Sequence, residues 1–442
     1  MSNVFYRRDD IISWGRVLRF PHQVARPSFS DELPELVSQL GPTDRGLAIG
    51  LRRSYGDSNL NPDGKVIDMT GLDRLLSFNE DSGLMRIEAG VSLSQALQVL
   101  VPRGWFLPTT PGTRFVTLGG AVANDVHGKN HHTAGTFGAN VRRLKLHRTD
   151  GSTHEIGPGD PLFHATVGGL GLTGVISWVE FQAMDIPSTM LDAEDISFEH
   201  VDEYFDLAAS KKDTHEHTMA WVDCSVGGSR LGRGVFSCAN WSADGGVRSH
   251  NDLPRHNIPF NLPGFVLNAL SVRAFNSILH DLKTIKSGCY RAHYENFLYP
   301  LDAISNWNRL YGQAGFYQYQ CVLPPDTARE AVAELLKEIA RSGQGSPLGV
   351  LKDFGNAASA GMLSFPQPGT TLALDFGNKG EDTLALMARL DRIVLEGRGR
   401  LYPAKDGRIP AEVFRSSFPN WQAFTEFVDP GLTSSFWRRM SQ

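Results

Sequence analysis

Three histidines and a lysine fall within six residues in the segment HGKNHH, residues 127–132. His127 and His131 are four residues apart, which is the spacing of two metal ligands on one face of a helix. Gly128 and Asn130 disfavour a helix here, however, and the glutamate of an HExxH motif is absent. We therefore expect no metal site. Two interpretations stay open, in which the histidines either close loops through hydrogen bonds or line a cofactor pocket.

Three glycine-rich segments predict where a phosphate-bearing ligand is held. They are GLAIGLRRSYGDS (46–58), PGTRFVTLGGAVANDVHG (111–128) and VGGLGLTGV (167–175). Glycine lets the backbone approach a ligand closely, and successive N–H groups in such loops form anion-binding nests. A P-loop motif, GxxxxGK[ST], is absent. The segments thus favour a dinucleotide that is bound in another way.

Length and composition predict a globular chain with more than one domain. With 442 residues, two domains are expected, and a net charge of -5 gives no reason to expect nucleic acid as a partner. The four cysteines form no CxxC pair, which fits a reducing compartment. The first ten residues lack the apolar core of a signal peptide, and no run of about 18 apolar residues occurs. We expect a cytoplasmic protein, with peripheral attachment to the inner membrane face as an alternative.

Hydrophobic patterning predicts a mixture of strands and helices on either side of a boundary at IPST, residues 186–189. Ser92 and Gln95 form a capping box that begins a helix, whose apolar face holds Leu93, Ala96, Leu97 and Leu100. Two further amphipathic helices are expected, at residues 326–342 and 382–396. Short runs rich in Val, Ile, Phe and Trp predict strands at 66–69, 84–89, 175–181, 221–222 and 234–236.

Residues 250–286 form an unusual stretch, rich in proline and then in large apolar residues. Phe265, Leu270, Ile278 and Leu282 stand out, and basic residues flank them, namely Arg255, Arg273, Lys283 and Lys286. One interpretation is a helix packed on the core. The other is an apolar lid that meets a lipid or a membrane surface.

Several motifs together resemble the decaprenylphosphoryl-β-D-ribose 2-oxidase family, which is of the vanillyl-alcohol-oxidase type. The three glycine-rich segments carry the first part of this resemblance, together with AGTFG. It covers nearly the whole chain in order, through SWGR (13–16), PLD (300–302), WNRLYG (307–312), QYQ (318–320), LSFPQPG (363–369) and GRLYPAKDGR (399–408).

The resemblance implies an α+β, two-domain fold of the vanillyl-alcohol-oxidase or PCMH type. Residues 1–187 would form the FAD-binding domain, completed by residues 400–442. Residues 188–399 would form a substrate domain with an antiparallel sheet. The implied reaction is oxidation of the 2-hydroxyl of a lipid-linked ribose to a ketone. An NADH-dependent short-chain reductase would act as a partner and complete the epimerisation to the arabinose donor for cell-envelope polysaccharide.

The resemblance also implies site residues. The FAD contacts would be Gly50, Leu51, Arg52, Arg53, Ser54, Tyr55, Gly56, Asp57, Gly112, Thr117, Gly119, Gly120, Ala121, Asn124, His127, Val175 and Tyr402. The active-site residues would be His127, Lys129 and Lys405. The substrate contacts would be Trp221, Leu298, Gln318, Gln320, Lys352, Thr371, Ala373 and Lys129.

Some positions depart from the family pattern. Arg52 stands where the family has glycine. Arg53 stands where aldonolactone oxidases carry the histidine that bonds to flavin, so noncovalent FAD is expected. Leu298, Thr371 and Ala373 replace a tyrosine, an asparagine and a cysteine of the substrate pocket, so the pocket is expected to differ from that of the family at these three positions.

Alcohol oxidation needs a group that takes the hydroxyl proton, and Lys405 is our candidate because burial can lower a lysine pKa into the useful range. Alternatively, Lys405 stays charged and stabilises reduced flavin. His127 would position the hydroxyl, and Lys129 and Lys352 suit a substrate phosphate. Gln318 and Gln320 are two apart on an expected strand, so both would face the sugar.

Three functions are compatible with these sequence features. The first is FAD-dependent oxidation of a lipid-linked sugar phosphate, which residues 255–286 favour. The second is an FAD oxidase for a soluble sugar, alditol or aldonolactone. The third is a flavoprotein fold that serves as a binding module without turnover. The presence of His127, Lys129, Gln318 and Lys405 together argues against the third.

Overall fold

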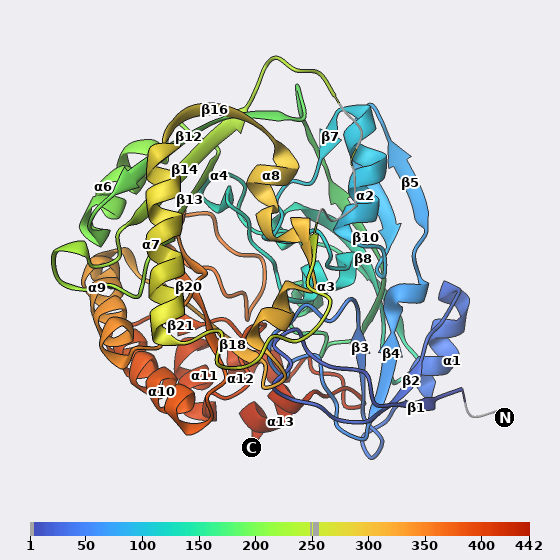
Figure 1. Ribbon diagram of the computed structural model, residues 1–442. Coiled ribbons are helices and arrows are strands. Elements are labelled where there is room, and N and C mark those ends of the chain that lie inside the picture. Colours follow the sequence, from blue (N-terminus) through green and yellow to red (C-terminus); the bar gives the residue numbers. More distant parts are fainter. Residues whose placement is uncertain (1–3, 248–249, 251–255) are drawn as a thin grey trace.

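The computed structural model describes residues 4–247, 250 and 256–442, and its antiparallel sheets and separate helices confirm the α+β class (Figure 1). A four-stranded sheet near the N-terminus has the order β1-β2-β4-β3, with β4 parallel to both of its neighbours. Its strands are β1 (Tyr6–Arg8), β2 (His22–Ala25), β3 (Gly46–Ile49) and β4 (Lys65–Asp68). Helix α1 (Leu33–Ser38) contributes Leu33, Leu36 and Val37 to the core beneath this sheet.

A five-stranded antiparallel sheet follows, in the order β5-β6-β10-β8-β9. Its strands are β5 (Leu75–Asn79), β6 (Leu84–Glu88), β8 (Val141–His147), β9 (Thr153–Ile156) and β10 (Val175–Gln182). The associated helices are α2 (Leu93–Leu100), α3 (Leu118–Ala123), α4 (His131–Ala134) and α5 (Pro161–Thr166). Helix α2 begins at the predicted capping box, because the Ser92 hydroxyl accepts from the backbone N–H of Gln95.

The largest sheet has eight antiparallel strands in the order β16-β12-β14-β13-β19-β20-β18-β21. Its strands are β12 (Met190–Phe198), β13 (His217–Val222), β14 (Gly234–Trp241), β16 (Gly288–His293), β18 (Phe316–Leu323), β19 (Gly349–Phe354), β20 (Gly369–Gly377) and β21 (Arg400–Leu401). Two short pairs complete the strands, β7 (Trp105–Phe106) with β11 (Met184–Asp185), and β15 (His256–Asn257) with β17 (Ile304–Ser305).

Side chains alternate between the two faces of this large sheet. One face packs Leu372, Leu374, Tyr319 and Cys321 into a core with helices α6 (Val201–Lys211), α9 (Pro325–Ser342) and α10 (Glu381–Glu396). Because successive residues of a strand point to opposite faces, the polar residues between them point the other way. The predicted helices at 326–342 and 382–396 therefore pack on the outer face, and the inner faces of β13, β18, β19 and β20 are left for ligands.

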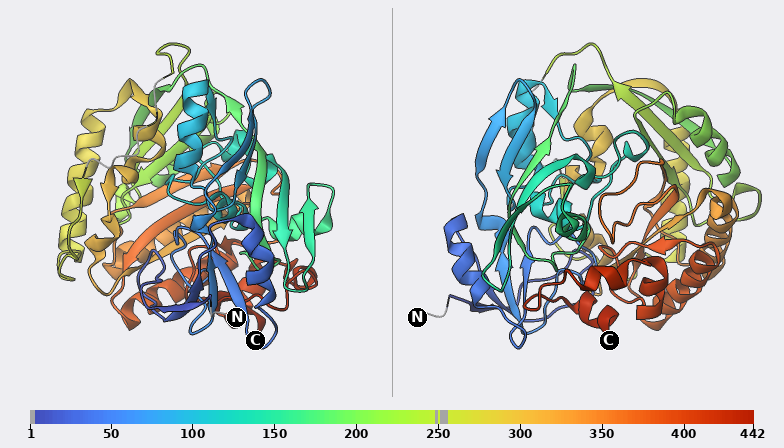
Figure 2. Two further views of the ribbon diagram at one scale, coloured as in Figure 1. Left: turned by 90° about the vertical axis from the view of Figure 1, so that its right-hand side faces the viewer. Right: turned by 180° about the vertical axis from the view of Figure 1, so that it is seen from behind.

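The C-terminal segment returns to the N-terminal sheet. Its helices are α11 (Ala411–Ser417), α12 (Trp421–Thr425) and α13 (Ser435–Ser441). Gly46 at the start of β3 forms a parallel bridge with Leu432, and Arg439 of α13 forms an ion pair with Asp57 at 2.8 Å. Figure 2 shows the C-terminal helices beside the N-terminal sheet at one end of the molecule. The two ends of the chain thus build one wall together.

Helix α7 (Ala269–Ile285) runs across the inner side of β12 and β14, and α8 (Tyr294–Leu298) follows β16 (Figure 1). The helix packed on the core is confirmed for α7, whereas contact with a lipid or membrane surface stays a prediction. Val272, Asn276 and His280 of α7 are buried, whereas Leu270 is 80% exposed and Ile285 is 81% exposed. Arg255 lies outside the described residues. No helix in the described ranges is both long and apolar enough to cross a membrane.

Candidate active site

A cavity of about 940 Å³ lies between the glycine-rich loops and the inner face of the large sheet. This volume is at the upper end of the range for ligand pockets, about 300–1,000 Å³, and suits a large cofactor together with a substrate. All three glycine-rich segments reach its wall. So do the loop after β21 and the cavity-facing residues of β13, β18, β19 and β20.

Most of the predicted FAD contacts line this cavity. They are Gly50, Leu51, Arg52, Arg53, Ser54, Tyr55, Gly112, Thr117, Gly119, Gly120, Asn124, His127 and Tyr402. The hydroxyl of Tyr402 donates to the backbone carbonyl of Asn124 at 2.8 Å, which joins the C-terminal loop to the second glycine-rich segment.

Four predicted FAD contacts do not line the cavity. Asp57 is engaged by Arg439, as described above. Ala121 of α3 and Val175 at the start of β10 are fully buried in apolar cores. Gly56 has a different role, because a Cβ there would lie 1.5 Å from the backbone oxygen of Asp406. Only glycine allows the loop after β3 to approach the C-terminal loop this closely, and this approach brings Tyr55 beside Lys405.

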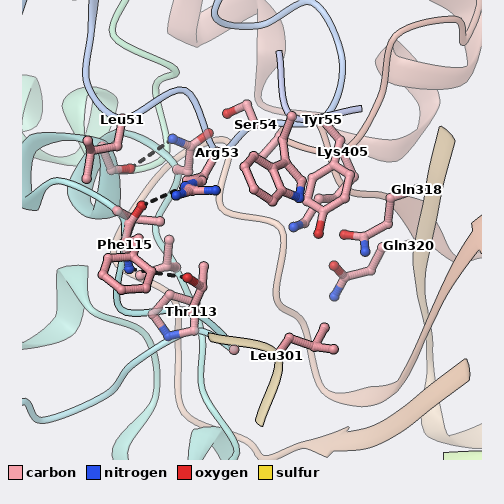
Figure 3. A pocket seen from close by; sticks show the side chains of 18 of the residues that line it. Leu51, Arg53, Ser54, Tyr55, Thr113, Phe115, Leu301, Gln318, Gln320 and Lys405 are labelled. Atoms are coloured by element: carbon pink, nitrogen blue, oxygen red, sulfur yellow. Dashed lines mark hydrogen bonds between the residues drawn. The ribbon is translucent and has the colours of Figure 1, made fainter. Parts of the chain in front are cut away.

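Arg52 and Arg53, which depart from the family pattern, both fit the local backbone and the cavity wall. Arg52 keeps the left-handed backbone that a glycine would adopt, with φ of 56°. The Arg53 guanidinium lies 3.9 Å from the centre of the Trp14 ring and donates to the carbonyl of Phe115 at 3.1 Å (Figure 3). The turn is therefore preserved, and the side chain of Arg53 is held against the wall.

Asn59 is a wall residue that the sequence did not single out. It lines the cavity, yet both polar atoms of its side-chain amide are buried with no hydrogen-bond partner in the described part of the chain. Buried amides rarely stay unpaired, because each unmade hydrogen bond costs about 1–3 kcal/mol. An amide that both donates and accepts fits a cofactor rich in carbonyls, ring nitrogens and hydroxyls. The wall therefore fits FAD.

His127 occupies the centre of the site. Its Nδ1 lies 2.9 Å from Lys352 Nζ, and its Nε2 lies 3.2 Å from the amide nitrogen of Gln320. The ring also packs against Phe354 at 4.7 Å, which fixes its orientation. Burial, reinforced by the charge of Lys352, holds the pKa of His127 well below its usual range. His127 is thus a neutral, oriented hydrogen-bonding group.

Three half-buried lysines line the site. Burial lowers the pKa of Lys405 to about 8, against an opposing effect of Asp375. Burial also lowers the pKa of Lys352 to about 7 and that of Lys129 to about 7. Lys405 lies over the ring of Tyr55, with its Nζ 4.0 Å from the ring centre. Each of these lysines can change protonation state near neutral pH.

Two of the three lysines donate to backbone carbonyls. Lys129 Nζ donates to the carbonyls of Phe297 and Leu298, both at 2.8 Å. Lys352 Nζ donates to the carbonyl of Gly128 at 3.0 Å, besides its contact with His127. These two ammonium groups therefore hold the wall of the site in shape.

The predicted substrate contacts all line the cavity. They are Lys129, Trp221, Leu298, Gln318, Gln320, Lys352, Thr371 and Ala373. The strand register brings Gln320 beside Ala373, Ala373 beside Val350, and Val350 beside Trp221, so one row crosses four strands. Gln318 and Gln320 point toward Lys405 and Tyr55 (Figure 3).

Asp375 is a second residue that the sequence did not single out. It is fully buried on β20 opposite Gln318, whose amide donates to its Oδ1 at 2.7 Å. The Oδ2 atom is buried and has no hydrogen-bond partner among the described residues. Burial raises the pKa of Asp375 to about 7. The signal in the sequence was its two-residue spacing from Ala373 on the same strand, which places both on one face.

The remaining histidines of the opening segment lie away from the cavity wall. His131 packs on Phe354 with ring centres 4.4 Å apart, and His132 Nε2 contacts the carbonyl of His215 at 2.8 Å. Among the described residues, the one group of metal-ligand types that converges is Glu194, His215 and Cys238. Lys211 Nζ already pairs with Glu194 there at 2.5 Å.

Comparisons with known proteins also indicate that the chain binds FAD. Residues 21–157 match a family model described as an FAD binding domain. The chain is 36% identical over 436 residues to a decaprenylphosphoryl-β-D-ribose oxidase of Mycolicibacterium smegmatis, which covers 95% of this chain and 94% of the relative. An uncharacterised Streptomyces coelicolor protein is 30% identical over 79% of this chain and its own full length.

A further relative matches a shorter part of the chain. It is an L-gulono-1,4-lactone dehydrogenase of Mycobacterium tuberculosis, 30% identical over 38% of each chain. The shared part is therefore narrower than in the first two relatives, one of which matches nearly the whole chain. The chain belongs to the decaprenylphosphoryl-β-D-ribose oxidase family and is an FAD-dependent oxidoreductase.

Proposed function

We propose that this enzyme oxidises the 2-hydroxyl of a polyprenyl-phosphoryl ribose to the 2-keto sugar. The observation that carries the proposal is the composition of one cavity. Polar groups for a sugar, Gln318, Gln320 and His127, lie inside it, and α7 borders it with an exposed apolar face. A ligand with a polar head and an apolar tail suits this arrangement. The similarity to the Mycolicibacterium oxidase supports the same substrate class.

When bound, FAD accepts the hydride that leaves the carbinol carbon. The protein must remove the hydroxyl proton, and Lys405 is the group for this step. With a pKa of about 8, a substantial fraction of its amine is uncharged near neutral pH and can accept that proton. Asp375, which accepts from the amide of Gln318, lies within electrostatic reach of Lys405 and favours the ammonium form that results.

His127 positions the hydroxyl. Its Nδ1 lies beside Lys352 Nζ, and its Nε2 accepts from the amide nitrogen of Gln320, so the neutral ring is held from both sides. Gln320 also lies 3.2 Å from the hydroxyl of Thr371, so the three side chains form a connected polar surface. This surface suits the remaining hydroxyls of a pentose.

We assign FAD binding to residues 1–187 together with 400–442, and substrate binding to residues 188–399. The cofactor is noncovalent in this proposal, because Arg53 stands where relatives with a flavin bond carry histidine. Acid precipitation should release all of the flavin into the supernatant. Flavin that stays in the protein pellet would contradict this part of the proposal.

The outer face of α7 contacts a lipid surface in this proposal. Leu270, Ile278, Leu282 and Ile285 are all at least half exposed on this helix, and Phe265 just before it is 77% exposed. An exposed apolar helix face with basic neighbours, Arg273 and Lys286, is typical of peripheral attachment to anionic membranes. This would place the enzyme at the cytoplasmic side of the inner membrane. In a vesicle flotation assay, I278E/L282E should lose binding, whereas a control, K379E, should retain it.

The keto product must be reduced again to yield an epimer, and we propose that an NADH-dependent short-chain reductase does so.

The alternative substrate class is a soluble sugar, alditol or aldonolactone. The similarity to a lactone dehydrogenase supports this alternative. Anaerobic mixing decides between them. Bleaching of oxidised flavin by farnesyl-phosphoryl ribose, and none by free alditols or lactones, is the expected result. The reverse pattern would overturn the proposed substrate.

A further inference from the structure

Helix α7 packs on the domain with one face, lines the cavity with a second and exposes the apolar third face described above. Val272, Asn276 and His280 face the domain, and Asn276 donates to Asp223 at 3.0 Å and to the carbonyl of Ser346 at 3.1 Å. Phe275, Leu279 and Lys283 follow one another at four-residue intervals and line the cavity. A four-residue interval keeps side chains on one helical face. The helix is therefore anchored on one side and borders the ligand space on the next.

Lys283 differs from the other lysines of the cavity wall. The ammonium groups of Lys129 and Lys352 donate to backbone carbonyls, and that of Lys405 lies over Tyr55. The backbone carbonyl of Lys283 accepts from Ser287, but its ammonium group makes no hydrogen bond or ion pair with any described residue. Its side chain is half-buried, so its ammonium group reaches the cavity without being enclosed. It is a cation at the cavity wall that is available to a ligand.

The position of Lys283 along the ligand path is also informative. Its charge is felt by Lys129, whose pKa it lowers, so Lys283 lies within electrostatic reach of the inner site. Its neighbour in sequence, Leu282, belongs to the exposed apolar face. Lys283 thus lies between a polar interior and an apolar exterior. In a polyprenyl-phosphoryl sugar, the phosphate occupies this same place between sugar and lipid.

We propose that Lys283 binds the substrate phosphate at the mouth of the cavity, with Phe275 and Leu279 against the first isoprene unit. The inference rests on the proposed function and deepens it. It also revises the expectation that Lys129 and Lys352 bind the phosphate, since both are engaged by the protein. A single ammonium is enough to bind a phosphate oxygen, and its loss weakens the charge-assisted contact.

Steady-state kinetics of K283M with farnesyl-phosphoryl ribose test the inference. Methionine keeps the length and helical preference of lysine and removes the charge. We expect KM to rise about tenfold or more, with kcat within about twofold of wild type, and K283R should restore most of the affinity. K379M is the control, because Lys379 is exposed and does not line the cavity. Its KM should stay unchanged.

A second substrate separates a phosphate contact from a general loss of fit. With farnesyl riboside, which has no phosphate, K283M and wild type should have equal KM values. An unchanged KM of K283M for the phosphorylated substrate would overturn the inference and leave the proposed function standing. An equal rise for both substrates would show that Lys283 only shapes the wall. If wild type turns over neither substrate, the proposed function itself fails, and the inference falls with it.

Discussion

Lys352 Nζ lies 2.9 Å from His127 Nδ1, and the two side chains come from positions 225 residues apart in the chain. The contact holds one side of the His127 ring, and the amide nitrogen of Gln320 holds the other. Lys352 is held in turn by the carbonyl of Gly128. The lysine therefore acts on the chemistry through the histidine, as a positioning residue.

Replacing Lys352 by methionine should slow flavin reduction about 10- to 100-fold, because a hydrogen bond to a charged group contributes roughly 1.5–3 kcal/mol. His127 would lose the contact that holds its ring, and its pKa should rise because a neighbouring cation is removed. Stopped-flow absorbance under anaerobic conditions measures the rate, and NMR of the labelled ring measures the pKa. K379M, at an exposed lysine, is the control. A reduction rate within twofold of wild type would exclude the positioning role.

The rate of flavin reduction should increase with pH up to about 8 and then level off. Lys405 has a pKa of about 8, and its uncharged form, which accepts the proton, grows as pH rises through that value. K405M should lower the rate by at least about 100-fold while FAD stays bound. The pH profile of the single-turnover rate is the measurement. A rate that falls above pH 8 would instead identify charged Lys405 as the active form, acting on reduced flavin.

Arg52→Gly should stabilise the protein. Arg52 has a φ of 56°, a conformation that costs an L-residue about 1 kcal/mol and costs glycine almost nothing. The midpoint of thermal unfolding should rise by about 1–2 °C. Arg52→Ala keeps the Cβ and should give no gain, so it separates backbone strain from loss of the side chain. Equal midpoints for the two variants would argue against strain at this turn.

Asn59→Leu should weaken FAD binding roughly tenfold, since one or two hydrogen bonds to the unpaired amide would be lost. Fluorescence titration of the apoprotein with FAD measures the dissociation constant. Asn240→Ala provides the control, because Asn240 is exposed on β14 and lies outside the cavity wall. Tight FAD binding by the leucine variant would show that the amide does not face the cofactor.

The sequence predicted correctly those features that depend on residues close together in the chain, such as helix caps and apolar periodicity. The capping box at Ser92 begins α2, and the apolar periodicity at 326–342 and 382–396 marks α9 and α10. The two-residue spacing of Gln318 and Gln320 correctly predicted that both face one side of β18. Strands at 221–222 and 234–236 were located but drawn too short, because polar residues such as Thr218, Ser237 and Asn240 interrupt the apolar runs.

The assembly of the site was decided by tertiary structure. By itself, the sequence determined the α+β class, the glycine-rich loops and the family, through motifs carried by contiguous residues. It could not show that Gly56 serves the approach to Asp406, that Asn59 has an unpaired amide, or that Lys129 and Lys352 donate to backbone carbonyls. Those facts depend on which groups remain without partners once distant segments pack, because hydrogen bonding and burial are properties of the folded neighbourhood rather than of a residue's type.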